Sequence, residues 1–447
     1  MQRDEGLQAY YGDLHSHCAV GYGQGSLEDA YINARTQLDF AAVTVHGHWA
    51  DLPVDQGRLK DLVAYHREGF RRTREAWPRV REVVRANHQP GEFLSFLAFE
   101  WHSCRFGDHN VYFQADEGEV IPAPDLAALR AELRALQARG VESLLIPHHI
   151  GYRRGYRGIN WDTYTPEFSP VVEIMSMHGC AESARAPYPY LHTMGPRDGA
   201  STYQHGLARG HRVGVIGSTD HHSAHPGSHG HGRLGVWSRD LTRQAVWEAI
   251  RARRTWALTG DNIQVQFALN GQPMGSVVPA DRERRIAASV RGGGGVDYVE
   301  VVHNQQVVHR VSPGVQNTGR KGEPFQSPLK VELELGWGEK DREVTWDGEL
   351  EVVNGELTGV EPRFKGRDVV EPQEDRQAQY AFSSWQRLDK GVRFRTKTWG
   401  NPTTTTRGTQ ALCLEVEGDP GTLLRGRLNG TRVEFPLGEI LRGPKTG

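Results

Sequence analysis

The stretch "YYGDLHSHCAVGYG", residues 10–23, places two histidines one residue apart, directly after a start that resembles a β-strand. Residues i and i+2 of a strand point to the same side, so we expect His15 and His17 to project together. Two imidazoles on one side suit the chelation of one cation, and Asp13 is expected to orient His15. The alternative is a pair of ordinary buried histidines, and only the rest of the chain distinguishes the two.

Five more apolar runs end in histidine or carboxylate side chains, which can bind metal or transfer protons. The runs are "FAAVTV" (40–45), "FLSFLAFE" (93–100), "ESLLIPHH" (142–149), "VVEIMSMH" (171–178) and "RVGVIGSTD" (212–220), and they end at or beside His46, Glu100, His148, His178 and Asp220. Helical patterns lie between several runs, which predicts βα units and a parallel sheet or barrel. Because the active site of an α/β barrel lies at the C-terminal ends of its strands, we expect these side chains to meet.

Clear start signals mark the helices. Ser26 with Asp29 three residues later has the form of a capping box, and the pattern that begins at Asp125 ends at Gly140. The apolar periodicity of residues 58–87 predicts one long helix or two helices divided near Pro78.

The second half of the chain has a different pattern. After about residue 260, alternating strands are joined by Asp-Gly and Asn-Gly turns, which are strong hairpin signals. All 21 histidines except His303 and His309 lie before residue 232. We therefore expect a metal-binding catalytic domain over residues 1–260 and a β-rich, sandwich-like accessory domain over residues 261–447.

Bulk properties exclude several classes of function. A formal net charge of -2, with no basic stripe, argues against a protein that binds nucleic acid or a membrane surface through its charge. The chain has no run of ~18 apolar residues, which a membrane-spanning helix would need. The first residues lack the apolar core of a signal peptide. The four cysteines form no CxxC pair and read as free thiols in a reducing compartment. We expect a cytoplasmic protein with a small-molecule substrate, and no sequence feature specifies its oligomeric state.

The candidate ligands indicate the type of metal. Histidines with a few carboxylates suit Zn, Mn or Fe, whereas all-oxygen clusters suit Mg or Ca. His222, two residues after Asp220, adds a further candidate. The candidates are too many for one ion, and a carboxylate such as Glu100 could bridge two.

The motifs "DLHSH", "VTVHGH", "FE", "IPHH" and "STDHH", in this order over roughly residues 10–260, resemble the PHP superfamily, named for its polymerase-associated and histidinol phosphatase members. The continuation after residue 232 resembles an uncharacterised branch of PHP-like proteins that carry a β-rich tail. The resemblance implies a distorted (β/α)7 barrel with two or three divalent ions. It also implies a phosphatase or phosphodiesterase in which a metal-bridging hydroxide attacks a small-molecule phosphate ester.

The resemblance also implies roles for individual residues. His15 and His17 would bind a first metal with Glu100 and Asp220. Glu100 would bridge to a second metal, which His148 would also bind. His178 falls where the family has a further ligand, and His46 and His222 would bind a third metal. The chain departs from the family at Val45, where an aspartate is usual, and near Gly23, where some members have another histidine. Both departures affect the third metal.

Catalysis of phosphate transfer needs an acid and an anion-binding group. His178 or His221 could protonate the leaving group, and "HHIGYRRGYRG" offers Arg153, Arg154 and Arg157 for bidentate contacts to phosphate. Two alternatives remain: a metallohydrolase of an amide, ester or glycan-linked group, and a non-catalytic binding protein stabilised by metal. An arginine clamp would favour phosphate, an aromatic-lined cleft would favour the first alternative, and a coordination site saturated by protein ligands would favour the second.

Overall fold

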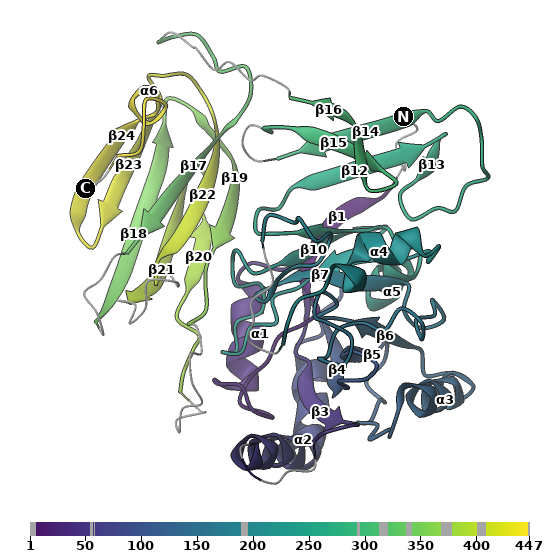
Figure 1. Cartoon of the computed structure of the whole chain (residues 1–447). Coiled ribbons are helices and arrows are strands. Elements are labelled where there is room, and N and C mark those ends of the chain that lie inside the picture. Colours follow the sequence, from purple (N-terminus) through teal and green to yellow (C-terminus); the bar gives the residue numbers. More distant parts are fainter. Residues whose placement is uncertain are drawn as a thin grey trace. The chain divides into compact units, whose positions relative to one another are not determined.

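The computed structural model describes residues 6–53, 57, 59–188, 195–292, 296–312, 321–336, 342–367, 378–399 and 408–445. The chain divides into two compact units (Figure 1). Unit 1 comprises Met1–Gly260, Gln264–Ser289 and Asp368–Ala381, and unit 2 comprises Asp261–Ile263, Val290–Arg367 and Phe382–Gly447. The chain therefore passes from one unit to the other more than once.

A mixed sheet forms the centre of unit 1. Its strands follow the order β11 (Thr255–Leu258), β10 (Arg233–Ser238), β1 (Gln8–Asp13), β2 (Phe40–Ala42), β4 (Leu94–His102), β5 (His109–Phe113) and β6 (Ser143–Pro147), with β3 (Val45–Trp49) also paired to β4. Pairing is parallel among β1, β2, β4 and β3. It is antiparallel at β10, β11, β5 and β6. The expected (β/α)7 barrel is thus not confirmed, and the unit is a mixed α/β structure.

A second, smaller sheet of unit 1 carries two of the expected run ends. Strand β7 (Val171–Ser176) pairs antiparallel with β8 (Gly179–Cys180) and parallel with β9 (Gly214–Gly217). Farther along the chain, β12 (Gln264–Leu269), β13 (Gln272–Pro273) and β14 (Ile286–Arg291) form a separate three-stranded sheet.

The helices begin where their capping residues predict. Helix α1 (Leu27–Arg35) follows Ser26, whose hydroxyl accepts the Asp29 N–H, and α3 (Leu126–Gln137) follows Asp125, whose carboxylate accepts the Ala128 N–H. These two caps are confirmed. Helix α2 (Lys60–Ala86) is one continuous helix with Pro78 inside it. The remaining helical segments of unit 1 are η1 (Gly199–Ser201), α4 (Tyr203–Ala208) and α5 (Arg243–Arg251). Among the described residues, no helix combines the length and apolarity needed to span a bilayer.

The main core of unit 1 explains why its strands are almost continuously apolar. Phe40 of β2, Phe96 of β4 and Trp247 of α5 belong to one buried cluster, and all nine residues of β4 are buried. A strand covered on both faces has no side for solvated polar groups. Any charged side chain on such a strand therefore needs partners inside the protein.

Unit 2 is built from two antiparallel sheets around one apolar core. The sheets are β17 (Leu329–Leu335), β22 (Gln410–Glu417) and β19 (Glu356–Arg363), and β20 (Ser384–Arg387), β21 (Gly391–Trp399), β18 (Glu343–Val353), β23 (Leu423–Leu428) and β24 (Thr431–Pro436). Buried residues of both sheets, such as Leu350 and Leu412, share one cluster, which is the arrangement of a β-sandwich. A hairpin of β15 (Val299–His303) and β16 (Gln306–Val311) and the short α6 (Leu437–Ile440) complete the described elements.

Candidate metal centre

The ends of the strands in unit 1 build a cluster of histidines and carboxylates. His15 and His17 follow β1, and Glu100 of β4 lies opposite His46 of β3 in the strand register. The turns after β6, β7 and β9 supply the other members, which are His148, His149, His178, Asp220 and His222. All eight residues predicted as metal ligands are therefore brought together, since each contacts at least one other member.

The carboxylate of Asp220 contacts both histidines of the first motif. Its Oδ1 lies 2.9 Å from Nε2 of His17 and 3.1 Å from Nε2 of His15. The two Nε2 atoms are 3.2 Å apart. Ligand atoms that each lie about 2.1 Å from one ion are roughly 3.0–3.4 Å from one another at octahedral or tetrahedral angles. The three atoms therefore have the spacing that one divalent ion requires.

The other oxygen of Asp220 faces a second pair of histidines. Oδ2 lies 2.9 Å from Nε2 of His178 and 3.4 Å from Nε2 of His149. Strand β9 ends at Gly217, and Asp220 has a left-handed backbone with φ of 54°. The strand rule that pairs residues i and i+2 therefore does not apply to Asp220 and His222. A left-handed backbone at a non-glycine residue costs about 1–3 kcal/mol, so the surrounding contacts must hold it.

Glu100 divides its two oxygens between two groups of histidines. Oε1 lies 2.7 Å from Nε2 of His148 and 3.2 Å from Nδ1 of His102. Oε2 lies 3.4 Å from Nε2 of His46 and 3.5 Å from Nε2 of His17, and it has no hydrogen-bond partner among the described residues. A carboxylate placed in this way can bridge two ions.

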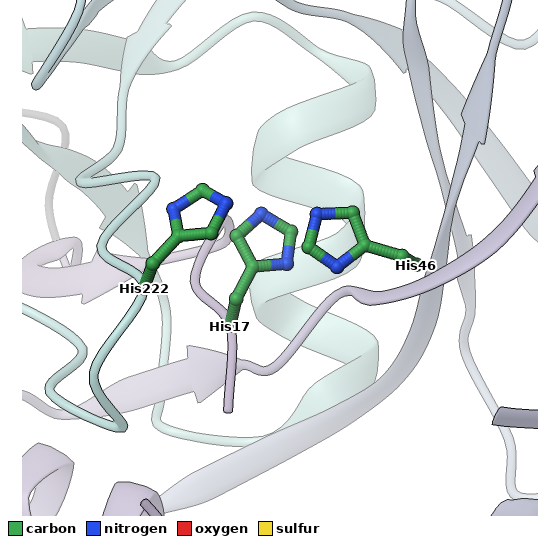
Figure 2. Close-up of side chains that lie close together, drawn as sticks. All are labelled: His17, His46 and His222. Atoms are coloured by element: carbon green, nitrogen blue, oxygen red, sulfur yellow. The ribbon is translucent and has the colours of Figure 1, made fainter. Parts of the chain in front are cut away.

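His17, His46 and His222 form a further group of the cluster, and Figure 2 shows the ring of His17 between the other two. The ring centroids of His17 and His46 are 3.9 Å apart, and those of His17 and His222 are 4.3 Å apart. The His222 side chain is 27% exposed, which opens this side to solvent. Tyr22 stacks on His46 with ring centroids 3.4 Å apart. A phenol therefore lies next to Gly23, near which some members of the PHP superfamily have a further histidine.

The protonation states favour metal binding by most of the histidines. Burial, together with the nearby His222, lowers the pKa of His17 to about 4, and burial lowers the pKa values of His46 and His148 well below the usual value. A neutral imidazole is the form that coordinates a metal. Burial also opposes charge on Asp220, but His15 and His149 outweigh it and hold the pKa of its carboxyl well below the usual value.

His15 behaves differently from the other histidines. Burial lowers its pKa, but Asp220 and Glu173 outweigh burial and raise the pKa of His15 well above the usual value. Nδ1 of His15 lies 2.9 Å from Oε2 of Glu173, which leaves Nε2 directed at Asp220. The two carboxylates thus favour the protonated form of His15.

Glu173 was missed by the sequence analysis, which assigned the orienting role to Asp13. The carboxylate of Asp13 instead accepts the backbone N–H groups of His15 and Thr219, each at 3.0 Å. The signal for Glu173 was present, because a carboxylate inside the buried run "VVEIMS" needs an internal partner. Burial raises the pKa of Glu173 to about 7, and the adjacent His15 partly opposes this shift.

Two further groups beside the cluster, His102 and Asp108, were not among the predicted ligands; His102 belongs to β4 and not to a loop. His102 shares a strand face with Glu100 by the i, i+2 rule, and this signal was available. Asp108 lies with Glu100, His148 and His149 in one group whose potential ligand atoms are all within 4.8 Å of one another. No local pattern marks Asp108, which precedes β5 and is brought to the cluster only by the tertiary fold.

The predicted arginines Arg153 and Arg154 extend to surface carboxylates instead of the cluster. Arg153 is 54% exposed and lies 3.9 Å from Asp198, and Arg154 is 60% exposed and lies 2.5 Å from Asp162. The turn returns inward at Arg157, whose backbone is left-handed with φ of 72°. Arg157 is 12% exposed, and its guanidinium lies 2.6 Å from Asp108 and 3.9 Å from Oε1 of Glu100. The arginine at the cluster is therefore Arg157.

The two predicted acids lie in different surroundings. Nδ1 of His178 lies 3.1 Å from the hydroxyl of Tyr152, which leaves Nε2 facing Asp220. Nδ1 of His221 lies 3.2 Å from the hydroxyl of Ser223, and its ring stacks on His231 with centroids 5.3 Å apart. Of the two, His178 has the direct contact with Asp220.

Comparisons with known proteins give weak similarities. No family model matches the chain. Uncharacterised proteins of Chlamydia trachomatis and Chlamydia pneumoniae are each 27% identical over 177 residues, which is 36% of this chain and 28% of each relative. The chain thus spans about 28% of the length of these curated relatives.

Two solved structures are similar at low superposition scores. One is a two-domain protein from Bacteroides vulgatus that contains a predicted PHP-like metal-dependent phosphoesterase, with 11% identity, a TM-score of 0.34 and coverage of 96% of this chain and 95% of that chain. The other is the lesion-specific endonuclease EndoQ from Pyrococcus furiosus, with 12% identity, a TM-score of 0.32 and coverage of 55% and 56%.

Proposed function

We propose that the chain is a metal-dependent hydrolase of the PHP superfamily that acts on a small-molecule phosphate ester. The observation that carries the proposal is the placement of Glu100, whose Oε1 faces His148 at 2.7 Å and whose Oε2 faces His46 at 3.4 Å and His17 at 3.5 Å. A buried carboxylate between two groups of neutral imidazoles is the arrangement that a two-metal hydrolase uses. The ordered histidine motifs of the sequence support the same assignment.

The residues divide into groups that suit two or three ions. His15, His17 and Asp220 would hold one ion, and Glu100 and His148 would hold a second with Asp108 or His149 nearby. His46 and His222 would hold a third ion beside His17, whose Nε2 faces Asp220 and would serve the first ion. When bound, divalent ions lower the pKa of coordinated water and polarise the ester that is cleaved. Imidazole-rich donor sets of this kind suit Zn, Mn or Fe.

The surrounding side chains have roles that suit hydrolysis. Tyr152 holds His178 so that Nε2 can give a proton to a leaving oxygen. Arg157 supplies a guanidinium beside Glu100 that can orient a phosphate. A purely structural metal site is closed by protein ligands, whereas the partly exposed His222 leaves one side of this cluster accessible to substrate.

A second candidate is hydrolysis of an amide, ester or glycan-linked group. Aromatic side chains beside the cluster favour this reading: Trp49 lies 5.6 Å from the ring of His102 and 5.0 Å from that of His66. Arg157 lies over the Trp49 ring at 4.9 Å and is paired with Asp108, so its charge is already balanced. Aromatic side chains beside a charge-balanced arginine can bind an apolar or sugar-like group as well as a phosphate.

Substitution of Glu100 tests the metal-dependent function. Glu100→Gln keeps the size of the side chain but removes the charge that two ions would share. We expect metal content to fall by about one ion per chain and hydrolysis to fall by about 100-fold or more. Metal analysis by mass spectrometry and a panel of phosphomonoesters, phosphodiesters, carboxyl esters and amides would measure both effects and separate the two candidate substrates.

The matched control is Glu132→Gln, because Glu132 is an exposed residue of α3. This variant should keep both metal content and hydrolysis. If Glu100→Gln behaves like the control in both measurements, the chain is not a hydrolase that uses this cluster. If only the esters or amides without phosphate are cleaved, the second candidate replaces the first.

A further inference from the structure

A short segment around Tyr380 lies against the part of unit 1 that carries the first metal-binding motif. Tyr380 is 5% exposed and belongs to the stretch Asp368–Ala381, which returns to unit 1. Its hydroxyl donates to Oε1 of Gln24 at 2.7 Å, and its backbone N–H donates to Oδ2 of Asp29 at 3.1 Å. The contact therefore joins residues that are more than 350 positions apart.

Asn33 of α1 connects this segment to the loop after β9. Its side-chain amide donates to the carbonyl of Tyr380 at 3.1 Å and to the carbonyl of Ala224 at 2.8 Å. Asn33 is 1% exposed, so both hydrogen bonds are shielded from water. Ala224 has a left-handed backbone with φ of 52°, and the bond from Asn33 helps to hold it.

The same loops are joined directly to two of the metal-binding histidines. The backbone N–H of Gln24 donates to the carbonyl of His222 at 2.8 Å, and the N–H of Ala224 donates to the carbonyl of His17 at 3.0 Å. The packing is close: a Cβ at Gly25 would lie 2.7 Å from Cβ of Ala224 and 2.8 Å from Cδ2 of Tyr380. A displacement of Tyr380 would therefore loosen the backbone that carries His17 and His222.

We propose that Tyr380 is a positioning residue of the metal centre, which fixes the backbone that carries His17 and His222. It acts through Gln24, Gly25 and Ala224 and contacts no ion itself. The proposal rests on the proposed function only in requiring that the cluster binds metal, and it holds whichever bond is hydrolysed. A merely structural Tyr380 would change the overall stability without changing the affinity of one ion relative to the others.

The test is a Zn²⁺ titration of chelator-stripped full-length protein, followed by calorimetry and by metal analysis after dialysis. Tyr380→Phe keeps the ring against Gly25 and removes only the hydroxyl that binds Gln24. We expect the ions held by His17 and His222 to bind about 10-fold less tightly, while the ion held by Glu100 and His148 keeps its affinity. Gln24→Ala should give the same loss, and the double variant should lose no more than either single variant, because both remove one interaction.

The matched control is Tyr164→Phe, which removes the hydroxyl of a half-buried tyrosine that donates to the carbonyl of Ser169 at 2.6 Å. It should leave every Zn²⁺ affinity unchanged. Equal Zn²⁺ affinities in wild type and Tyr380→Phe, or a uniform loss for all ions, would overturn the positioning role. A wild-type protein that binds no Zn²⁺ would instead contradict the proposed function, so the two failures are distinguishable.

Discussion

Asp39 shows how one side chain outside the metal cluster can make stability depend on pH. Its carboxylate accepts the backbone N–H of Tyr11 at 2.7 Å. Burial raises the pKa of Asp39 to about 6, and the hydrogen bond from Tyr11 only partly opposes this shift. In the unfolded chain the group titrates near ~3.9. Because ionisation is harder in the folded state, this residue reduces stability increasingly as the pH rises from about 4 through about 6.

Asp39→Asn should remove this pH dependence, because the amide can still accept the Tyr11 N–H but cannot ionise. Between pH 4 and 6.5 we expect the variant to gain about 1–2 kcal/mol in unfolding free energy relative to wild type. This is less than the roughly 3 kcal/mol of the full shift, because the side chain is partly exposed to water. Urea unfolding at several pH values would measure the difference. Asp281→Asn, at an exposed position, is the control, and a difference that does not change with pH would contradict the prediction.

Single residues also show what the sequence could predict about the site. Glu100 and Asp220 were recognisable because carboxylates at the ends of apolar runs need partners, and the structure places each among histidines. Arg157 could not be distinguished from Arg153 and Arg154, because the three lie in one turn and only the left-handed backbone at Arg157 returns its side chain inward. The direction of a side chain in a loop depends on backbone angles that local sequence does not specify.

At the scale of elements, helix α1 carries several of the contacts that hold the loops of His17 and His222. Its first turn is capped by Ser26, whose hydroxyl accepts the Asp29 N–H at 3.0 Å. We expect Ser26→Ala to lower the unfolding free energy by about 1 kcal/mol and Ser26→Asp, which can still cap, to lower it by much less. Chemical denaturation of the three proteins measures this ranking. Equal stabilities for Ser26→Ala and Ser26→Asp would show that the cap contributes nothing.

The helices were more predictable than the sheet because their signals are local. Ser26 and Asp125 mark helix starts within four residues of sequence, and both caps are confirmed. Strand direction has no such signal. The antiparallel pairing of β10 with β1 joins Tyr11 to Gly235, and partners so distant are chosen by the packing of the whole unit. The expected parallel sheet or (β/α)7 barrel is therefore confirmed only in part, as a mixed sheet with a parallel centre.

At the scale of the whole molecule, bound ions should contribute to folding stability. Ions that bind only the folded chain stabilise it by mass action, by about 2.7 kcal/mol for one site at 100 times its Kd. Chelation should therefore lower the melting temperature by several degrees, as measured by calorimetry with and without EDTA. In Glu100→Gln the decrease should be smaller, because less metal is bound. Identical melting temperatures for wild-type protein with and without chelator would contradict the prediction.

The long return of the chain to Tyr380 has a consequence for synthesis on the ribosome. All of the predicted ligands have been polymerised by His222, but the tyrosine that holds their loops is added roughly 160 residues later. At 5–20 residues per second this interval lasts roughly 10–30 s. During that time the nascent chain has its complete set of ligands without the contacts of Tyr380. Under the proposed role of Tyr380, the ions held by His17 and His222 would therefore reach full affinity only after residue 380 has been translated.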